Sequence, residues 1–262
     1  MEIERKRACE AFNDYVSGYD PRNPRIALKV AHTLRVAQLC DRIARAQGAG
    51  EANLSREDVD VAWLCGLLHD MGRFEQVRRY DTFNDAQSVS HAALGVQVLF
   101  ENDASLLRRF VDDTSQDRLV RTVVATHSDY RLPQSLGERT ATLCNVLRDA
   151  DKIDILQVNC ICPIEDIYGV SEQDMAQSEL SPAVVDAFYE QRTVPRDIRR
   201  FPADILVGHL CFAWELVFEQ SRQAMREQGY LGQMLSRRFA NERTRSEFQK
   251  MAHYMRAQLR ME

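Results

Sequence analysis

A histidine and an aspartate stand side by side, at His69 and Asp70, directly after the eight uncharged residues 61–68. The uncharged run predicts the buried end of a helix, and Gly72 predicts a left-handed helix stop. An aspartate in the last turn of a helix faces the negative end of the helix dipole, and an apolar setting makes its charge costly. A bound cation would remove both costs, which makes the pair candidate metal ligands. A His-Asp pair in a surface turn explains this fragment equally well.

Four of the six histidines and one further aspartate fall on predicted helices, at positions whose spacing places them on apolar faces. Besides His69, the set comprises His32 in a helix over 25–46, His91 in a helix that Ser90 caps, His127 at the end of a helix over 116–127, and Asp151 in a helix over 138–158. A hydrogen-bonded core histidine, or a buried ion pair for Asp151, is the simpler explanation of each residue alone. Together they predict that several helices converge on one interior point.

In order and local context these residues resemble the H…HD…D signature of the HD-domain metal-dependent phosphohydrolases. The matching contexts are Leu67-Leu68-His69-Asp70-Met71-Gly72 and Arg148-Asp149-Ala150-Asp151-Lys152. The resemblance covers residues 25–158. It implies an all-helical core in which His32, His69, Asp70 and Asp151 bind a divalent metal ion.

Family members that bind two ions add two histidines between the HD pair and the final aspartate, and the HD aspartate bridges both ions. His91 and His127 occupy that interval here. Some of these members carry a His-His pair at the later position, whereas Ser128 follows His127, so one or two ions remain open. Ligands made only of nitrogen and oxygen favour manganese, iron, magnesium, nickel or cobalt over structural zinc.

The resemblance implies a metal-dependent phosphohydrolase that cleaves a phosphoester of a small metabolite or nucleotide with a metal-activated water. Asp70 would bridge the ions or orient the water. Cationic side chains must neutralise the remaining phosphate charge. We expect catalytic roles for Arg73 and Lys152 beside Asp70, and substrate contacts from Arg35, Arg73, Arg78 and Arg131. A solvated position for Arg78, and pairing of Lys152 with a core acid, are the competing explanations.

Three alternatives to a phosphohydrolase remain open. Some HD-family relatives are di-iron oxygenases with the same six-ligand set, and oxygen consumption by an iron-rich preparation would favour that chemistry. A non-catalytic HD module with a regulatory role would be marked by ligand loss, and none of the four core ligands is missing. A helical scaffold without metal would be supported by elemental analysis that finds no ion.

The composition of the 262 residues is that of a soluble globular protein, with 45% hydrophobic and 28% charged residues. A net charge of −5 gives no basic field, so we expect no nucleic-acid polymer and no membrane as partner. Seven scattered cysteines and an N-terminus without an apolar run predict a cytoplasmic protein. Oligomeric state is open, and C-terminal helices are often used to form a homodimer.

No alternating strand pattern emerges, so we predict an all-α protein with one continuous core. Residues 1–262 would form a single domain, with an HD-type metal-binding core over 25–158 and, over 159–262, a flap and additional C-terminal helices packed on the core. Residues 73–90 lack a clean period and predict a long polar loop, which is often functional in a compact domain. The later helices are predicted over 182–192, 203–227, 230–239 and 241–260.

Overall fold

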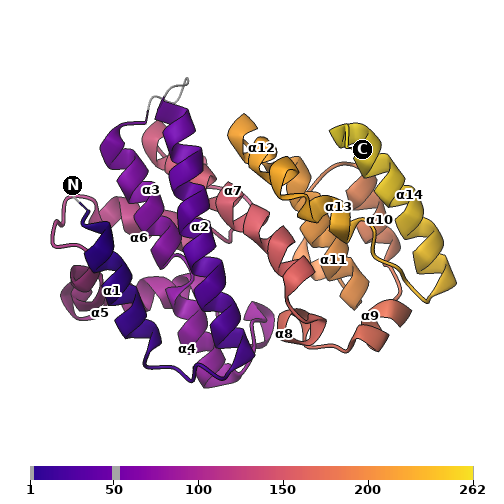
Figure 1. Cartoon of the computed structure of the whole chain (residues 1–262), viewed down its shortest axis with the longest axis horizontal. Coiled ribbons are helices and arrows are strands. Elements are labelled where there is room, and N and C mark those ends of the chain that lie inside the picture. The colour runs from indigo at the N-terminus through magenta and orange to yellow at the C-terminus, as the bar shows by residue number, and fades with distance from the viewer. Residues whose placement is uncertain (1–2, 49–53, 262) are drawn as a thin grey trace. The chain divides into compact units, whose positions relative to one another are not determined.

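The computed structural model describes residues 3–48 and 54–261 (Figure 1). The chain divides into two compact units, residues 1–151 and residues 152–262. Every regular element in the described ranges is a helix, which confirms the predicted all-α class. Over the same ranges no helix has both the length and the apolar character needed to cross a membrane. The predicted single domain, with its core over 25–158, stays a prediction.

The first unit contains the helices on which the candidate site is built. They are α1 (Arg5–Val16), α2 (Pro24–Gly48), α3 (Arg56–Leu68), α4 (Met71–Tyr80), the short 3-10 helix η1 (Asp85–Gln87), α5 (His91–Phe110), α6 (Asp117–Thr126) and α7 (Glu138–Ile161), which runs on into the second unit. Helix α2 packs against α3, and α4 packs against α5. These two helix pairs position most of the predicted ligands.

Helix α3 carries the uncharged run and buries all of it, as predicted. Its start is set by a capping box, in which the Ser55 side chain accepts from the Asp58 backbone and the Asp58 side chain accepts from the Ser55 backbone. A Cβ atom on Gly66 would lie 2.7 Å from the Cα atom of Ala37. The absence of a side chain at Gly66 therefore lets α3 approach α2 closely, one turn before His69.

Residues 71–80 form helix α4, so the prediction of a loop over 73–90 was wrong for this stretch. The apolar residues Phe74 and Val77 are buried three positions apart, but arginines on the other faces obscure this pattern in the sequence. Gly72 is not a left-handed helix stop either, since it lies inside α4. A Cβ on Gly72 would lie 2.2 Å from the His91 carbonyl oxygen and 2.4 Å from the Gly95 nitrogen. The glycine thus allows α4 to cross α5.

The second unit consists of shorter helices. They are α8 (Ile164–Tyr168), α9 (Glu172–Gln177), α10 (Pro182–Tyr189), η2 (Arg196–Ile198), α11 (Pro202–Leu210), η3 (Cys211–Glu215), α12 (Glu219–Gln228), α13 (Tyr230–Met234) and α14 (Glu242–Leu259). The helix predicted over 203–227 is therefore interrupted. Leu216 and Phe218 adopt extended backbone, and Trp214 packs its ring near Phe188 and Tyr254, with centroids 6.2 and 6.4 Å away. This aromatic packing overrides the helical period.

Candidate metal centre

Asp70 lies at the centre of the candidate site, at the junction of two helices. Helix α3 ends at Leu68, and Asp70 occupies the position that precedes the first residue of α4. The side chain of Asp70 is 3% exposed. The carboxylate therefore lies at the positive N-terminal end of the α4 dipole as well as beyond the end of α3. The helix-dipole cost expected from the sequence is correspondingly offset.

The Oδ2 atom of Asp70 faces two imidazoles from α2 and the end of α3. It lies 3.5 Å from Nε2 of His32 and 3.3 Å from Nε2 of His69. Asp151, on α7, places Oδ1 3.2 Å from the first of these nitrogens and 3.8 Å from the second. The structure thus brings together the four residues of the H…HD…D signature.

The other carboxylate oxygen, Oδ1, faces the imidazoles of His91 and His127. The Nε2 atoms of these residues lie 3.7 and 3.9 Å from Oδ1 and 3.0 Å from each other. His91 is the first residue of α5, and His127 directly follows α6. Two groups of ligand atoms therefore share Asp70, each with spacings below 4.8 Å that a metal ion could span.

Hydrogen bonds on the far side of the rings show which nitrogens face inward. Nδ1 of His69 donates to the Gly66 carbonyl at 2.8 Å, and Nδ1 of His127 donates to the Val124 carbonyl at 2.7 Å. Nδ1 of His91 lies 2.7 Å from a carboxylate oxygen of Asp85 and donates to it. With Nδ1 protonated, a neutral imidazole has a lone pair on Nε2.

This arrangement fits a cation. Burial lowers the pKa of His91 to about 4 and that of His127 to about 3, so both rings are neutral at pH 7. Their Nε2 lone pairs then face each other across 3.0 Å with no proton between them. A metal ion that accepts both lone pairs would turn this repulsion into two bonds.

The two aspartates at the site are ionised. Burial raises the pKa of Asp70, but the Lys29 ammonium and the His69 ring outweigh it, and the pKa lies well below its usual range. Burial also opposes ionisation of Asp151, but its contact with the His32 ring and the nearby His69 ring lower its pKa. Carboxylate and imidazole ligands of this kind suit the divalent ions expected from the sequence.

A second layer holds His91 in place, and sequence reasoning missed its central residue, Asp85. This aspartate accepts from Arg73 at 2.9 Å and from the Gln76 side chain at 3.0 Å, in addition to His91. Arg73 also donates to the Phe83 carbonyl at 2.7 Å. The predicted catalytic Arg73 therefore connects α4 to the segment that precedes α5, and its Nε lies 3.7 Å from Asp70 Oδ1.

Lys29 is a further residue that the sequence did not reveal. Its ammonium lies 2.6 Å from Asp70 Oδ2, and its side chain is 14% exposed. The signal that could have identified it is its position, three residues before His32 on α2, which places both side chains on one face. The ring of Phe83 lies 5.3 Å from the ammonium and 5.6 Å from the Arg73 guanidinium.

The other predicted cations have contacts of different kinds. Lys152 belongs to the second unit, where its ammonium lies 4.0 Å from the Glu215 carboxylate. Arg78 pairs with Glu75 at 2.5 Å, and Arg131 lies over the Tyr130 ring at 4.5 Å. Arg35 is half-buried on α2, one turn after His32. Catalysis by Lys152 and substrate binding by the three arginines stay predictions.

Arg148, in the last turn before Asp151, anchors the end of α6. Its Nη1 donates to the carbonyls of Thr126 and His127, both at 3.1 Å, and to that of Asp129 at 2.6 Å. Thr126 is the last residue of α6, and His127 and Asp129 follow it, so none of these carbonyls has a partner within the helix, although that of Thr126 also accepts from the Asp129 backbone at 3.2 Å. Arg148 thereby fixes the backbone that carries the His127 ring.

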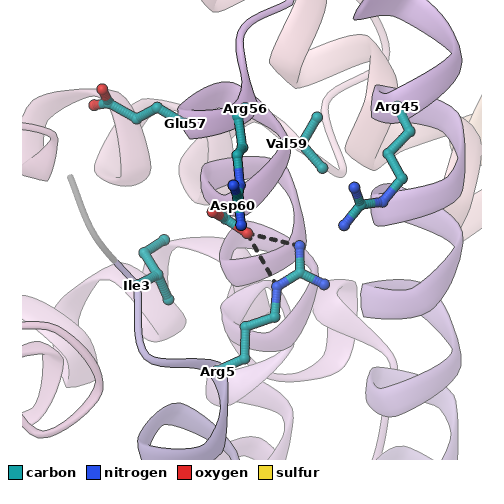
Figure 2. Close-up of a pocket in the computed structure, with 7 residues that line it drawn as sticks. All are labelled: Ile3, Arg5, Arg45, Arg56, Glu57, Val59 and Asp60. Atoms are coloured by element: carbon teal, nitrogen blue, oxygen red, sulfur yellow. Dashed lines mark hydrogen bonds and ion pairs between the residues drawn. The ribbon is translucent and has the colours of Figure 1, made fainter.

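A pocket of about 640 Å³ lies elsewhere in the first unit. Figure 2 shows the Arg5 guanidinium directed at Asp60, with Arg45 and Arg56 also on its wall. Arg5 is bound to Asp60 at 2.7 Å and to Asp41 at 2.5 Å. Among the residues that the structure describes, the lining includes no histidine and no member of the Asp70 cluster, so this pocket is not the candidate metal centre.

Comparison with known proteins gives one family. Residues 30–157 match the family model of the HD domain. The curated proteins and the solved structures gave no match. The matched range includes all six predicted metal ligands, which are His32, His69, Asp70, His91, His127 and Asp151. Residues 30–157 are therefore an HD domain, the domain of a superfamily of metal-dependent hydrolases, and the histidine and aspartate side chains gathered within this range fit the metal site of such a domain.

Proposed function

We propose that this protein is a metal-dependent phosphohydrolase that cleaves a phosphoester of a small metabolite or nucleotide. The observation that carries the proposal is the position of Asp70, whose two oxygens face two separate pairs of imidazoles. A carboxylate in this position can hold two ions at a fixed spacing. Two-ion sites of this kind clamp the attacking and leaving oxygens of a phosphoryl group.

Each half of the cluster would hold one ion. His32, His69 and Asp151 would bind the first with Asp70, and His91 and His127 would bind the second with Asp70. When bound, divalent ions lower the pKa of a water ligand and polarise a phosphoryl oxygen. The inward Nε2 lone pairs and the ionised carboxylates are the ligand states that such binding needs.

Two cations beside Asp70 can neutralise the phosphate. The Lys29 ammonium lies at Oδ2, and the Arg73 guanidinium lies near Oδ1. Nε of Arg73 is buried and has no hydrogen-bond acceptor among the residues that the structure describes. That N–H group supports the prediction that Arg73 donates to a phosphate oxygen, because charge-assisted hydrogen bonds to phosphate are strong. Lys29 joins it as a candidate that we add from the structure.

The test combines metal analysis of gently purified protein with a screen of phosphomonoesters and phosphodiesters in Mn²⁺, Fe²⁺, Mg²⁺, Ni²⁺ or Co²⁺. We expect bound metal and phosphate release in the wild type, and loss of both in Asp70→Ala with the helical circular dichroism spectrum retained. Asp81→Ala is the matched control, because this aspartate ends α4 with an exposed side chain paired to Arg25. Bound metal or turnover that survives Asp70→Ala would contradict the assigned role.

Oxygen consumption distinguishes the second candidate chemistry. The experiment uses iron-loaded protein. If this protein consumes oxygen with a substrate and releases no phosphate from any ester, the di-iron oxygenase reaction would take the place of the proposed hydrolysis. The same six residues would then serve as ligands. Phosphate release in the absence of oxygen would support the hydrolase instead.

A further inference from the structure

We propose that Asp85 is a positioning residue that makes His91 a metal ligand and so controls occupancy of one half of the site, the half made by Asp70, His91 and His127. This inference rests on the proposed metal site and adds a residue to it. The contact of Asp85 with His91 is made at a different ring nitrogen from Nε2, the atom that faces the cluster. Asp85 acts on the opposite edge of the His91 ring, through Nδ1.

His91 needs such a residue because of its place in the chain. His69 and His127 each donate Nδ1–H to the carbonyl three residues earlier, which belongs to their own helix. His91 is the first residue of α5, so no turn of that helix precedes it. The ring must be oriented from outside, and the Asp85 carboxylate does this with oxygens at 2.7 and 3.0 Å from Nδ1.

Asp85 is itself held firmly. Its Oδ1 accepts from Arg73 at 2.9 Å and from Gln76 at 3.0 Å, and both donors lie on α4. The short helix that Asp85 begins is capped by Asn84, whose side chain accepts from the Ala86 backbone at 3.0 Å. A carboxylate that is itself oriented in this way fixes the tautomer of a ligating histidine and raises the basicity of its other nitrogen.

The variant Asp85→Asn tests the tautomer with little change of shape. The amide oxygen is held by the two donors on α4, one of them charged, so the amide NH2 group is left to face His91. The amide nitrogen replaces Oδ2, which is the nearer of the two oxygens to Nδ1 at 2.7 Å, so Nδ1 accepts from the amide N–H and the proton moves to Nε2, the atom that faces Asp70 and His127. A protonated Nε2 cannot bind a metal ion.

Mn²⁺ alone serves as the probe, with equilibrium dialysis and metal analysis as the measurement. We expect two Mn²⁺ per chain in the wild type. In Asp85→Asn we expect one Mn²⁺ bound with wild-type affinity and the second bound about 10–100-fold more weakly. Asp81→Asn is the matched control from the same segment; its side chain pairs with Arg25 and should leave both Mn²⁺ affinities unchanged.

Three outcomes would overturn the proposal. They are fewer than two Mn²⁺ in the wild type, two Mn²⁺ of wild-type affinity in Asp85→Asn, and loss of both ions in that variant. Nitrogen-15 NMR of the metal-free protein gives an independent reading, with the His91 proton on Nδ1 in the wild type and on Nε2 in Asp85→Asn. A His91 tautomer that does not change would also refute the mechanism.

The experiment separates this inference from the proposed function. Counting Mn²⁺ and reading the tautomer require no substrate. A wild type that binds two ions but hydrolyses no phosphoester would refute the phosphohydrolase and leave the role of Asp85 intact. If the wild type hydrolyses phosphoesters and the Asp85→Asn variant keeps both ions, the role of Asp85 would be refuted and the phosphohydrolase would stand.

Discussion

Substitution of Gly72 by alanine tests the close crossing of α4 and α5. The added Cβ would lie 2.2 Å from the His91 carbonyl oxygen and 2.4 Å from the Gly95 backbone nitrogen. Both neighbours are backbone atoms and cannot rotate aside. The helices would have to separate by about 1 Å to reach an ordinary contact distance, in an interior that packs like a crystal.

The expected loss of stability follows from two opposing contributions. Overpacking of a well-packed interior costs about 1–3 kcal/mol, and a clash with backbone belongs at the upper end of that range. Alanine in place of glycine in a helix restores up to about 1 kcal/mol. We therefore expect Gly72→Ala to lower the free energy of unfolding by about 2 kcal/mol. Since the clash is with His91, the variant should also bind the second Mn²⁺ more weakly.

Urea unfolding followed by circular dichroism measures the first effect, and Mn²⁺ dialysis measures the second. Gly232→Ala is the control, because Gly232 lies in α13 and its added Cβ would meet only the Met261 side chain, at 3.6 Å. That variant should be unchanged or more stable by up to about 1 kcal/mol. Gly72→Ala with wild-type stability and wild-type Mn²⁺ binding would refute the packing argument.

Three further predictions concern stability. Arg148→Met should cost about 3 kcal/mol in urea unfolding, because it leaves the carbonyls around His127 without their buried donor; an unchanged midpoint would refute this anchoring. Burial raises the pKa of Asp58, but hydrogen bonds from Ser55 and Arg139 have the larger effect and bring the pKa below its ordinary value. The contribution of Asp58 to stability is therefore present above about pH 4 and is lost as the pH falls through the lowered folded-state pKa. Asp58→Asn should therefore lose about 1 kcal/mol at pH 7, with less further loss in acid than the wild type, as read from urea midpoints at both pH values. Mn²⁺ at a hundredfold excess over its dissociation constant should stabilise the wild type by about 2.7 kcal/mol, and thermal unfolding should show no such gain after chelation or in Asp70→Ala.

Helical periodicity predicted most of the helices that carry the candidate ligands, with the exception of α4. The spacing of apolar residues placed His32 and Asp151 on inward faces, and in the structure Nε2 of His32 lies 3.5 Å from Asp70 Oδ2 and 3.2 Å from Asp151 Oδ1. The order of the motif along the chain also agrees with the family match. Metal binding by these side chains stays a prediction.

Residues that act through tertiary contacts could not be predicted in the same way. Lys29 and Asp85 are ordinary charged residues in the sequence, and only folding shows that one meets Asp70 and the other meets His91. Helix α4 was missed because its buried apolar positions, such as Phe74, are few among charged ones. Gly72 satisfied the rule for a helix stop, whereas its actual role depends on a second helix.

The ammonium of Lys29, 2.6 Å from Asp70 Oδ2, has a consequence for ion selectivity. A metal ion that binds this oxygen would have to displace the lysine ammonium. Metal binding would therefore replace one positive charge beside Asp70 by another. Sodium or potassium carries no more charge than the lysine it would replace and gains little from the exchange. We expect a doubly charged ion to outcompete the lysine, whose displaced ammonium would then be available to contact an incoming anion.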